Sequence, residues 1–341
     1  MKKNLYLGTC LFLLVISCSE MDSGLFPVGV EVEDEIRVGW VDITGKIIYP
    51  PIFDDAREFS EGLAQVRVNR EWGYLNKIGE LVIEPQFSDS WEFSEGLAAV
   101  SSGYGKDEKW CYIDKTGKVV IPYQFDDAWS FSEGLAAVEI GEKWGYINKS
   151  GEFLINPSFA RVSDFSEGLA RVPDGMKFGY IDKTGEFVIS PQFSSAGSFS
   201  EGLAPVEINS KKGYIDKTGK LIIDSPFDGF FHFSEGLAEV YSGYGDDSKH
   251  GYIDKTGKVV IGLEFDDVWS FSEGLAAVEK DRKWGYIDKT GEVVIDFQFS
   301  RANEFINGMA YVAVARNEYM IINKTGECIL NLSDVTFKLE K

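Results

Sequence analysis

The 341-residue sequence predicts an all-β chain of tandem β-hairpin repeats, each about 34–38 residues long. Three observations support this prediction. The segment KWGYIDKTGEVVI that begins at Lys283 returns with few changes at Lys143 and Glu71. The glycine of this motif, or the residue in its place, recurs at spacings of 34, 38, 34, 34, 34, 38, 34 and 35 residues, and a fixed period indicates a repeat architecture. No window shows the 3.6-residue periodicity of an amphipathic helix.

Each unit begins with a short strand of the pattern LAxV and continues into a hairpin. Aromatic and β-branched residues flank an Asp-Lys-Thr-Gly turn, which is the pattern of two strands joined by a short glycine-containing loop. A proline in the pattern IxPxF ends the hairpin, because proline cannot donate to a ladder. The motif FSEG then forms a second turn, with glycine as its permissive residue. We therefore expect about three short strands in each unit.

Nine such units fill residues 25–332, joined by eight FSEG-type connectors. Residues 18–24 form a short tether ahead of the first unit, and residues 333–341 form a tail or a degenerate cap. A block of four units is duplicated, because SGYGKDEKWCYIDKTGKVVI from Ser102 matches SGYGDDSKHGYIDKTGKVVI from Ser242.

Two phenylalanines recur in every connector, and we expect them to form the core between stacked neighbours, because one repeat cannot bury its own apolar face. The first set is Phe53, Phe87, Phe125, Phe159, Phe193, Phe227, Phe265 and Phe299. The second set is Phe59, Phe93, Phe131, Phe165, Phe199, Phe233, Phe271 and Phe305.

The repeats can either stack as an open β-solenoid or superhelix, or close as a β-propeller-like array. Propeller repeats with four strands usually need ~40–45 residues, which is longer than the units here. Both ends of the repeat region also fall near unit boundaries, whereas a closed propeller often borrows a strand from its other end. A duplicated block would change the symmetry of a ring, while an open array only lengthens. The sequence thus favours the open form.

The first seventeen residues have the pattern of a secretory signal peptide. Lys2 and Lys3 precede an apolar run that is too short to cross a bilayer, which takes ~20 residues. Ser17 then lies directly before Cys18, which resembles a bacterial lipobox and implies cleavage before Cys18 and lipid attachment to it. We expect an exported, membrane-anchored lipoprotein of the bacterial cell envelope. Ser19 after the cysteine favours the outer membrane or the cell surface over the inner membrane.

The formal net charge of −21 argues against binding to nucleic acid and against electrostatic attachment to anionic lipid, since both need basic surfaces. The lipid anchor is therefore the only membrane contact that we expect. Cys111 and Cys328 lie too far apart in sequence for a metal-type spacing, and whether they pair stays open.

Catalytic and metal-binding patterns are absent from the sequence, so we expect no enzyme activity, no cofactor and no metal site. The only histidines, His232 and His250, occupy positions that other units fill differently, and we interpret both as surface positions. Adjacent acids such as Asp126 and Asp127 are read as part of a solvated turn, because neighbours in a strand point to opposite faces.

One position is a candidate for ligand binding. It is the residue two before the second phenylalanine of each connector, and we call it the variable position. Its occupants are Arg57, Trp91, Trp129, Ser163, Gly197, Phe231, Trp269 and Asn303. A position that accepts glycine and arginine is exposed, and exposed aromatic residues mark binding surfaces. Trp91, Trp129, Phe231 and Trp269 are therefore candidates for contact with a glycan or an extended peptide, with packing against the next unit as the alternative. Tyr104 and Tyr244, in the two longer loops, are further candidates.

In the order and recurrence of these motifs, the chain resembles the WG-repeat (KWG-repeat) proteins over residues 25–332. That resemblance implies bacterial, often exported repeat proteins with no general catalytic role and poorly defined partners. Cys111 departs from the motif glycine, and Lys212 and His250 depart from the motif tryptophan.

We therefore expect a lipid-anchored binding or interaction scaffold, whose partner is an unidentified protein or glycan. The alternatives are a hydrolase that acts on glycans and a passive spacer on the cell surface.

Overall fold

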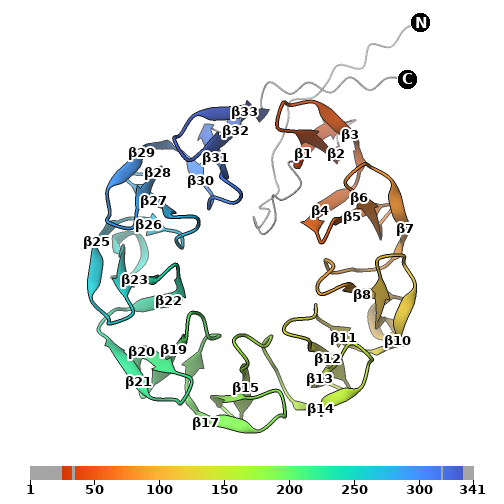
Figure 1. Ribbon diagram of the computed structural model, residues 1–341, viewed down its shortest axis with the longest axis horizontal. Coiled ribbons are helices and arrows are strands. Elements are labelled where there is room, and N and C mark those ends of the chain that lie inside the picture. The colour runs from red at the N-terminus through yellow and green to blue at the C-terminus, as the bar shows by residue number, and fades with distance from the viewer. Residues whose placement is uncertain (1–24, 33–34, 316–317, 333–341) are drawn as a thin grey trace, which may run out of the picture.

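The computed structural model describes residues 25–32, 35–315 and 318–332, and these form nine small antiparallel sheets in a closed ring around a central opening (Figure 1). The predicted signal peptide (1–17), Cys18, the tether (18–24) and the tail (333–341) lie outside the described residues. Among the described residues, no helix combines the length and the apolar character needed to cross a bilayer. The prediction of all-β repeats is confirmed. The preference for an open solenoid is wrong, because the repeats close as a β-propeller.

Each sheet is one blade, numbered in chain order, and its strands follow one another outward from the opening. Blade 1 contains β1 (Leu25–Val32), β2 (Glu35–Asp42) and β3 (Ile47–Phe53); blade 2 contains β4 (Asp55–Ser60), β5 (Leu63–Val68), β6 (Glu71–Asn76) and β7 (Leu81–Phe87); blade 3 contains β8 (Leu97–Ser102), β9 (Lys109–Asp114) and β10 (Val119–Phe125). Blade 4 contains β11 (Asp127–Ala128), β12 (Ala136–Ile140), β13 (Lys143–Ile147) and β14 (Phe153–Phe159); blade 5 contains β15 (Ala170–Asp174), β16 (Lys177–Ile181) and β17 (Phe187–Phe193); blade 6 contains β18 (Ser195–Ala196), β19 (Leu203–Ile208), β20 (Lys211–Asp216) and β21 (Leu221–Ser225). Blade 7 contains β22 (Gly229–Ser234), β23 (Leu237–Ser242), β24 (Lys249–Asp254) and β25 (Val259–Phe265); blade 8 contains β26 (Asp267–Val268), β27 (Leu275–Lys280), β28 (Lys283–Asp288) and β29 (Val293–Phe299); blade 9 contains β30 (Arg301–Ala302), β31 (Met309–Ala315), β32 (Glu318–Asn323) and β33 (Cys328–Asn331).

A repeat of 34 residues is long enough for a blade because the innermost strand has only two residues in blades 4, 6, 8 and 9, and the sheets of blades 3 and 5 have only three strands. In blade 4, the segment β11 pairs only Asp127 with Glu139 and Ala128 with Val138. A two-residue turn at Glu133 and Gly134 then leads into β12, with reciprocal backbone bonds between Ser132 and Leu135. The ~40–45 residues expected for a propeller repeat apply to blades with four strands of ordinary length, and these blades need fewer residues.

The glycine of the WG motif is required by the close approach of the outer strand. A Cβ on Gly145 would lie 2.5 Å from the carbonyl oxygen of Ile155, which is closer than any real contact. The outer strand also bulges here, since Tyr146 pairs with Ile155 and Ile147 pairs with Phe153. The glycine therefore recurs for steric reasons, and blade 3 carries Cys111 at this position beside a different outer strand, Ile121-Pro122-Tyr123.

The hydrophobic core lies between blades rather than inside them. In one interface, Trp144 and Tyr146 of blade 4 pack with Phe165, Val172 and Ile181 of blade 5. All eight phenylalanines of the second set are buried, and six of the first set are buried, while Phe159 and Phe227 are half-buried. The prediction that these rings form a core between neighbouring repeats holds for both sets.

Partly buried polar contacts also join each blade to the next from blade 2 to blade 9. The Tyr180 hydroxyl donates to the carbonyl oxygen of Gly197 at 2.7 Å, and the Ser166 hydroxyl donates to the carbonyl oxygen of Phe199 at 2.7 Å. The tyrosine bond recurs from Tyr74, Tyr112, Tyr146, Tyr180, Tyr214, Tyr252 and Tyr286. Each of these bonds reaches the carbonyl of the variable position in the following blade, so it fixes the innermost segment of that blade.

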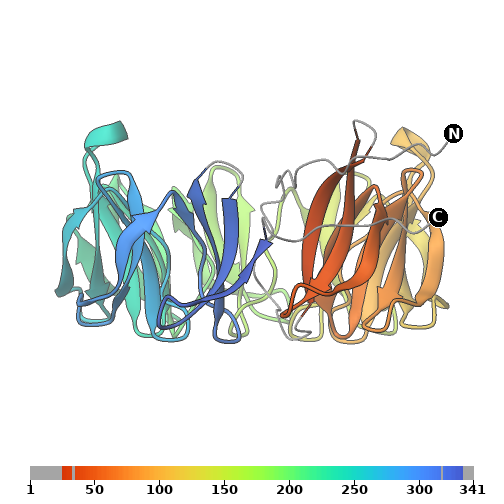
Figure 2. The same cartoon turned by 90° about the horizontal axis from the view of Figure 1, so that it is seen from above.

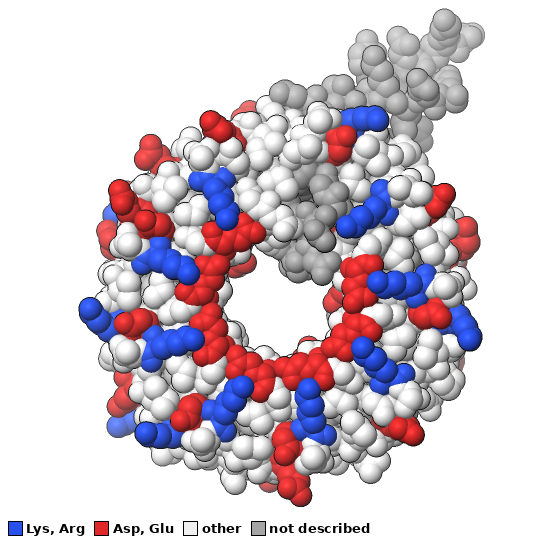
Figure 3. Space-filling model, viewed as in Figure 1, with Lys and Arg blue, Asp and Glu red and all other residues white. Residues whose placement is uncertain are grey.

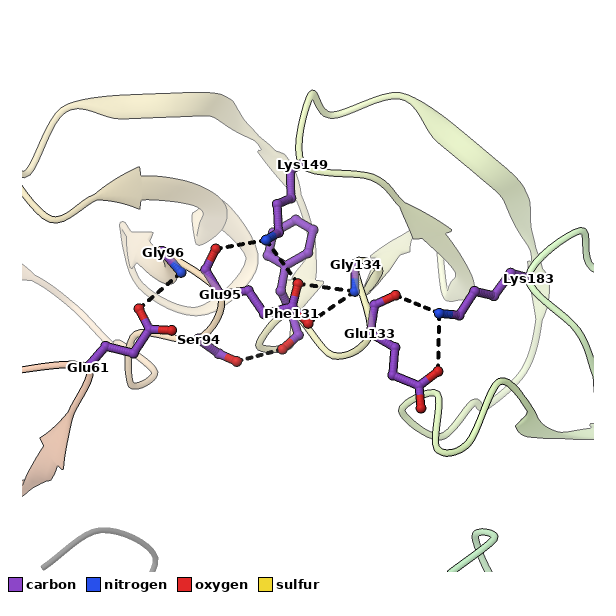
Figure 4. Close-up of polar contacts among 9 residues, drawn as sticks. All are labelled: Glu61, Ser94, Glu95, Gly96, Phe131, Glu133, Gly134, Lys149 and Lys183. Atoms are coloured by element: carbon purple, nitrogen blue, oxygen red, sulfur yellow. Dashed lines mark hydrogen bonds and ion pairs between the residues drawn. The ribbon is translucent and has the colours of Figure 1, made fainter. Parts of the chain in front are cut away.

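The glutamate of each FSEG turn forms the third link, which we call the clamp. Glu133 of blade 4 accepts a bond from the Gly168 N–H of blade 5 at 2.9 Å, and its carboxylate pairs with Lys183 at 3.1 Å. Figure 4 shows two successive clamps, from Glu95 and Glu133. The clamp glutamates are Glu61, Glu95, Glu133, Glu167, Glu201, Glu235 and Glu273, and their lysines are Lys115, Lys149, Lys183, Lys217, Lys255, Lys289 and Lys324.

The interface that closes the ring, between blades 9 and 1, is built differently. Three positions that hold serine, tyrosine and lysine in the clamped interfaces are here Ile306, Ile321 and Ile43. These residues pack in one apolar cluster with Val28 and Val41 of blade 1. Asn307 takes the position of the clamp glutamate. Within the described residues, the first and last blades therefore meet through apolar packing, and each keeps its own consecutive strands.

The clamp makes ring stability sensitive to acid. Burial works to raise the pKa of Glu167, but Lys217 and the Gly202 N–H together hold that pKa below its ordinary value, and Glu95, Glu235 and Glu273 behave likewise. A carboxylate with a lowered pKa stabilises the fold above its unfolded pKa, ~4.3, and loses that contribution as pH falls through its folded pKa.

We predict that replacing Glu95, Glu167, Glu235 and Glu273 together with glutamine lowers the free energy of unfolding by ~1–4 kcal/mol at pH 7, since an exposed pair contributes ~0.2–1 kcal/mol. The difference should shrink as pH falls below ~4.3. Urea denaturation across pH measures both effects, and Glu84→Gln on the outer strand β7 is the control. Equal urea denaturation curves for the parent and the fourfold variant at pH 7 would contradict a stabilising role of the clamp.

We also predict that Ile321→Ala lowers the free energy of unfolding by ~2–4 kcal/mol, because it leaves a cavity in the closing interface. Ile321 is fully buried, whereas Ile78 is 74% exposed, so Ile78→Ala serves as the control. Urea denaturation measures stability, and small-angle X-ray scattering in mild denaturant should show expansion of the variant first. A variant as stable as the parent would argue against a packed interface between blades 9 and 1.

Candidate functional site

Acidic side chains border the central opening on one face of the ring, and basic side chains lie outside them (Figure 3). The clamp accounts for this pattern, because each glutamate sits in the turn after an innermost strand and pairs with a lysine from a turn farther out. The glutamates are about 30% exposed and therefore remain accessible to solvent. The lysines neutralise them in part, while the chain keeps its net charge of −21.

The variable position lies on the innermost segment of blades 2 to 9. Trp129 and Trp269 directly follow β11 and β26, and Phe231 lies within β22. Trp91 is 43% exposed, Phe231 is 44% exposed and Trp269 is 48% exposed. Trp129 is half-buried and packs on Trp144 with ring centroids 5.0 Å apart. Three of the candidates, Trp129, Phe231 and Trp269, thus pack on an aromatic ring of their own blade, and Phe231 and Trp269 keep a large exposed surface as well.

The candidates form two pairs rather than one continuous stripe. Trp91 and Trp129 belong to blades 3 and 4, and Phe231 and Trp269 belong to blades 7 and 8. In Figure 1 these two blade pairs lie on opposite sides of the opening. The arrangement follows from the duplicated block of four units, which repeats the aromatic pair after four blades.

The two longer loops project from one face of the ring, far apart from each other (Figure 2). Each contains a single 3-10 turn, η2 (Gly105–Asp107) in blade 3 and η3 (Gly245–Asp247) in blade 7. Tyr104 is 71% exposed and Tyr244 is 82% exposed, and the Tyr244 hydroxyl donates to Asp228 at 3.3 Å. Both tyrosines are therefore available for contact, but they do not gather with the aromatic pairs into one site.

The adjacent acids make separate contacts, and Asp127 lies in the short strand β11 rather than in a turn. Asp126 accepts a bond from the Gly141 N–H at 2.7 Å and pairs with Lys109, while Asp127 accepts from the Ala128 N–H at 2.7 Å. Lys109 and the Gly141 N–H lower the pKa of Asp126, whereas burial raises the pKa of Asp127. The two carboxylates serve different contacts and do not converge on a common point.

The interpretation of His250 as a surface position is wrong. Its side chain is only 12% exposed and its Nδ1 lies 3.0 Å from Oε1 of Glu239. His232 is exposed, as expected. His250 stands where other units have tryptophan, and Glu239 stands where blades 3, 4 and 8 have alanine. The signal in the sequence was that both exceptions fall in the same unit.

Cys111 and Cys328 do not form a disulfide with each other, since Cys111 is buried and Cys328 is exposed. Burial raises the pKa of the Cys111 thiol to about 11, against a smaller opposing effect of Tyr123. Cys111 is therefore an unreactive core residue.

Solved structures with a similar chain path share little sequence with this protein. BamB from Moraxella catarrhalis is 10% identical with a TM-score of 0.41, and the match covers 80% of this chain and 95% of that one. Hsv2p from Kluyveromyces lactis is 11% identical with a TM-score of 0.41, and the match covers 68% of this chain and 91% of that one. At these scores the likenesses carry no argument about function. A comparison with curated proteins gives no match.

The family model for the WG-containing repeat matches eight times, over residues 39–71, 72–106, 110–144, 144–172, 178–211, 213–243, 251–284 and 284–314. These matches follow the hairpin and connector of successive blades and span most of the ring. The chain therefore belongs to the family of WG-containing repeat proteins.

Proposed function

We propose that the ring is a non-catalytic binding scaffold whose central opening receives an extended peptide segment with lysine or arginine side chains. One observation carries this proposal: Trp91, Phe231 and Trp269 belong to the innermost segments of their blades and are 43–48% exposed. Exposed apolar surface of this kind marks binding sites on soluble proteins. A repeat scaffold also offers many weak contacts along one extended ligand, and catalysis needs no part in this role.

The charge around the opening favours a basic peptide over a neutral glycan. The clamp glutamates lie at the mouth of the opening, and the whole chain is strongly acidic. Lysine and arginine side chains bind both to carboxylates and to the faces of tryptophan rings. Arg57 already lies 5.7 Å from the ring of Trp72, so a guanidinium over an indole is a contact that this scaffold accommodates.

We predict that the Trp91→Ala, Phe231→Ala, Trp269→Ala triple variant loses at least ~10-fold in affinity for extended basic peptides, because each lost aromatic contact weakens binding by ~1 kcal/mol or more. The full-length chain in detergent would be tested against an array of peptides and of cell-wall glycans. Tyr104→Ala, Tyr244→Ala is the matched control, since it removes exposed aromatic side chains outside the opening.

The outcomes separate the candidate functions. Binding of glycans instead of peptides, lost in the triple variant, would keep the site and change the ligand. Release of cleaved products would favour the hydrolase. A protein that binds neither class would fit a passive spacer and would overturn the proposal.

We also propose that the chain is exported and anchored by lipid on Cys18, at the outer membrane or the cell surface of a bacterium. The support is the lipobox-like sequence Val15-Ile16-Ser17-Cys18 behind a short apolar run. Expression in a diderm host with a radiolabelled fatty acid should label the parent chain and leave Cys18→Ser unlabelled. Equal labelling of both would refute the anchor.

A further inference from the structure

A cluster of ionisable side chains lies between blades 7 and 8, close to the innermost strands β22 and β26. Glu239 on β23 is only 8% exposed, and among the buried residues of the described chain it is the one acidic side chain. The Nδ1 atom of His250 on β24 lies 3.0 Å from its Oε1. Asp267, at the start of β26 in the next blade, brings its carboxylate within 4.8 Å of both. One imidazole and two carboxylates from two blades thus meet at one point.

The duplicated block supplies a built-in comparison for this cluster. Blade 3 corresponds to blade 7, and there Ala99 and Trp110 stand where blade 7 has Glu239 and His250. The acid of the following blade is common to both places, as Asp127 or Asp267. Blade 7 therefore differs from its duplicate by adding two side chains with metal-ligating atoms beside an acid that is already present.

Further differences between the two blades support the orientation of His250. Tyr241, which replaces Ser101, stacks on the imidazole with ring centroids 5.1 Å apart and an interplanar angle of 28°. Ser248, which replaces Glu108, places its Oγ 3.4 Å from Nε2 of His250. If Nε2 carries the proton and donates a hydrogen bond to Oγ of Ser248, then Nδ1 has a free lone pair beside the carboxylates of Glu239 and Asp267. In that tautomer, Nδ1 and the two carboxylates offer only acceptor atoms to one another, and a cation bound between them would offset their repulsion.

The position of Asp267 leaves room for that charge. Two donor atoms that each lie about 2.1 Å from one ion can be no more than about 4.2 Å apart, so the widest separation in the cluster must close slightly. Asp267 has an exposed side chain, and a change of its rotamer can supply this movement. Water can complete the coordination from the exposed side.

We propose that Glu239, His250 and Asp267 bind one divalent transition-metal ion, of the Zn²⁺ or Mn²⁺ type, which fastens blade 7 to blade 8. A set of one imidazole and two carboxylates suits such ions, whereas Ca²⁺ and Mg²⁺ prefer oxygen ligands alone. The stacked tyrosine and the serine then hold the imidazole in its ligating orientation, as outer partners of metal-bound histidines generally do. The metal site does not require the proposed peptide binding, although Tyr241, which stacks on His250, also packs on Phe231 with ring centroids 6.3 Å apart.

The test is titration of the full-length chain, stripped with EDTA, with ZnCl₂ or MnCl₂ in a calorimeter and in thermal unfolding. The comparison variant is Glu239→Ala, His250→Trp, which gives blade 7 the residues of blade 3 and so keeps an interface that this fold already builds. His232→Ala is the control for the other histidine. We expect one ion per parent chain, a raised Tm that EDTA reverses, and at least 100-fold weaker binding by the double variant, with His232→Ala unchanged.

Two results would overturn the proposal. Equal binding by the parent and the double variant would place the ion elsewhere, and no saturable binding by the parent would leave a plain hydrogen bond between His250 and Glu239. Asp267→Asn separates the role of the third ligand, because it should weaken metal binding at least 10-fold while the Tm without metal stays within a few degrees of the parent.

Discussion

The ring depends on a glutamate that is held in an unfavourable backbone conformation. Each of the seven clamp glutamates has a positive φ of 50–53°, in the left-handed region. Left-handed φ costs an ordinary L-residue ~1–2 kcal/mol, and asparagine or glycine would suit the position better. Glutamate occupies it seven times because only its longer carboxylate reaches the glycine N–H and the lysine of the next blade. The local cost is thus offset by a contact between blades.

The closing interface supports this account by contrast. Blade 9 carries Asn307 at the same position, with the same φ of 51°. Its neighbour is blade 1, where Ile43 replaces the clamp lysine, so a glutamate would have no cation to pair with at that position. The residue reverts to a type that the turn prefers, and the neighbouring serine becomes Ile306, which packs in the apolar cluster. The first and last blades therefore lose the clamp together and close by burial of apolar surface.

Local structure could be predicted from the sequence because the same motifs recur in successive repeats. The hairpins, the FSEG turns and the buried phenylalanines all follow from residue types that recur, such as Phe131 and Gly134. Closure could not be predicted, because it depends on Ile43, Ile306 and Ile321, which look like random drift until the two ends are brought together. The cluster at His250 was missed for a similar reason, since its partner Asp267 belongs to another blade. The recurring motif predicts the contacts within a repeat. It does not predict contacts between residues of different repeats that depart from the motif.

Closure also changes what the duplicated block means. In an open array, the aromatic pair of blades 3 and 4 and its copy in blades 7 and 8 would lie far apart along one surface. In the ring, blades 3 and 4 lie across the central opening from blades 7 and 8 (Figure 1). Under the proposed function, a ligand that spans the opening would contact both copies at once, and the second copy would add binding energy without a second ligand. The copies need not stay identical between the blades, and blade 7 has exchanged an alanine and a tryptophan for Glu239 and His250. The two duplicated blocks thus share aromatic residues at the variable position, whereas the interface between blades 7 and 8 carries ionisable side chains that its duplicate lacks.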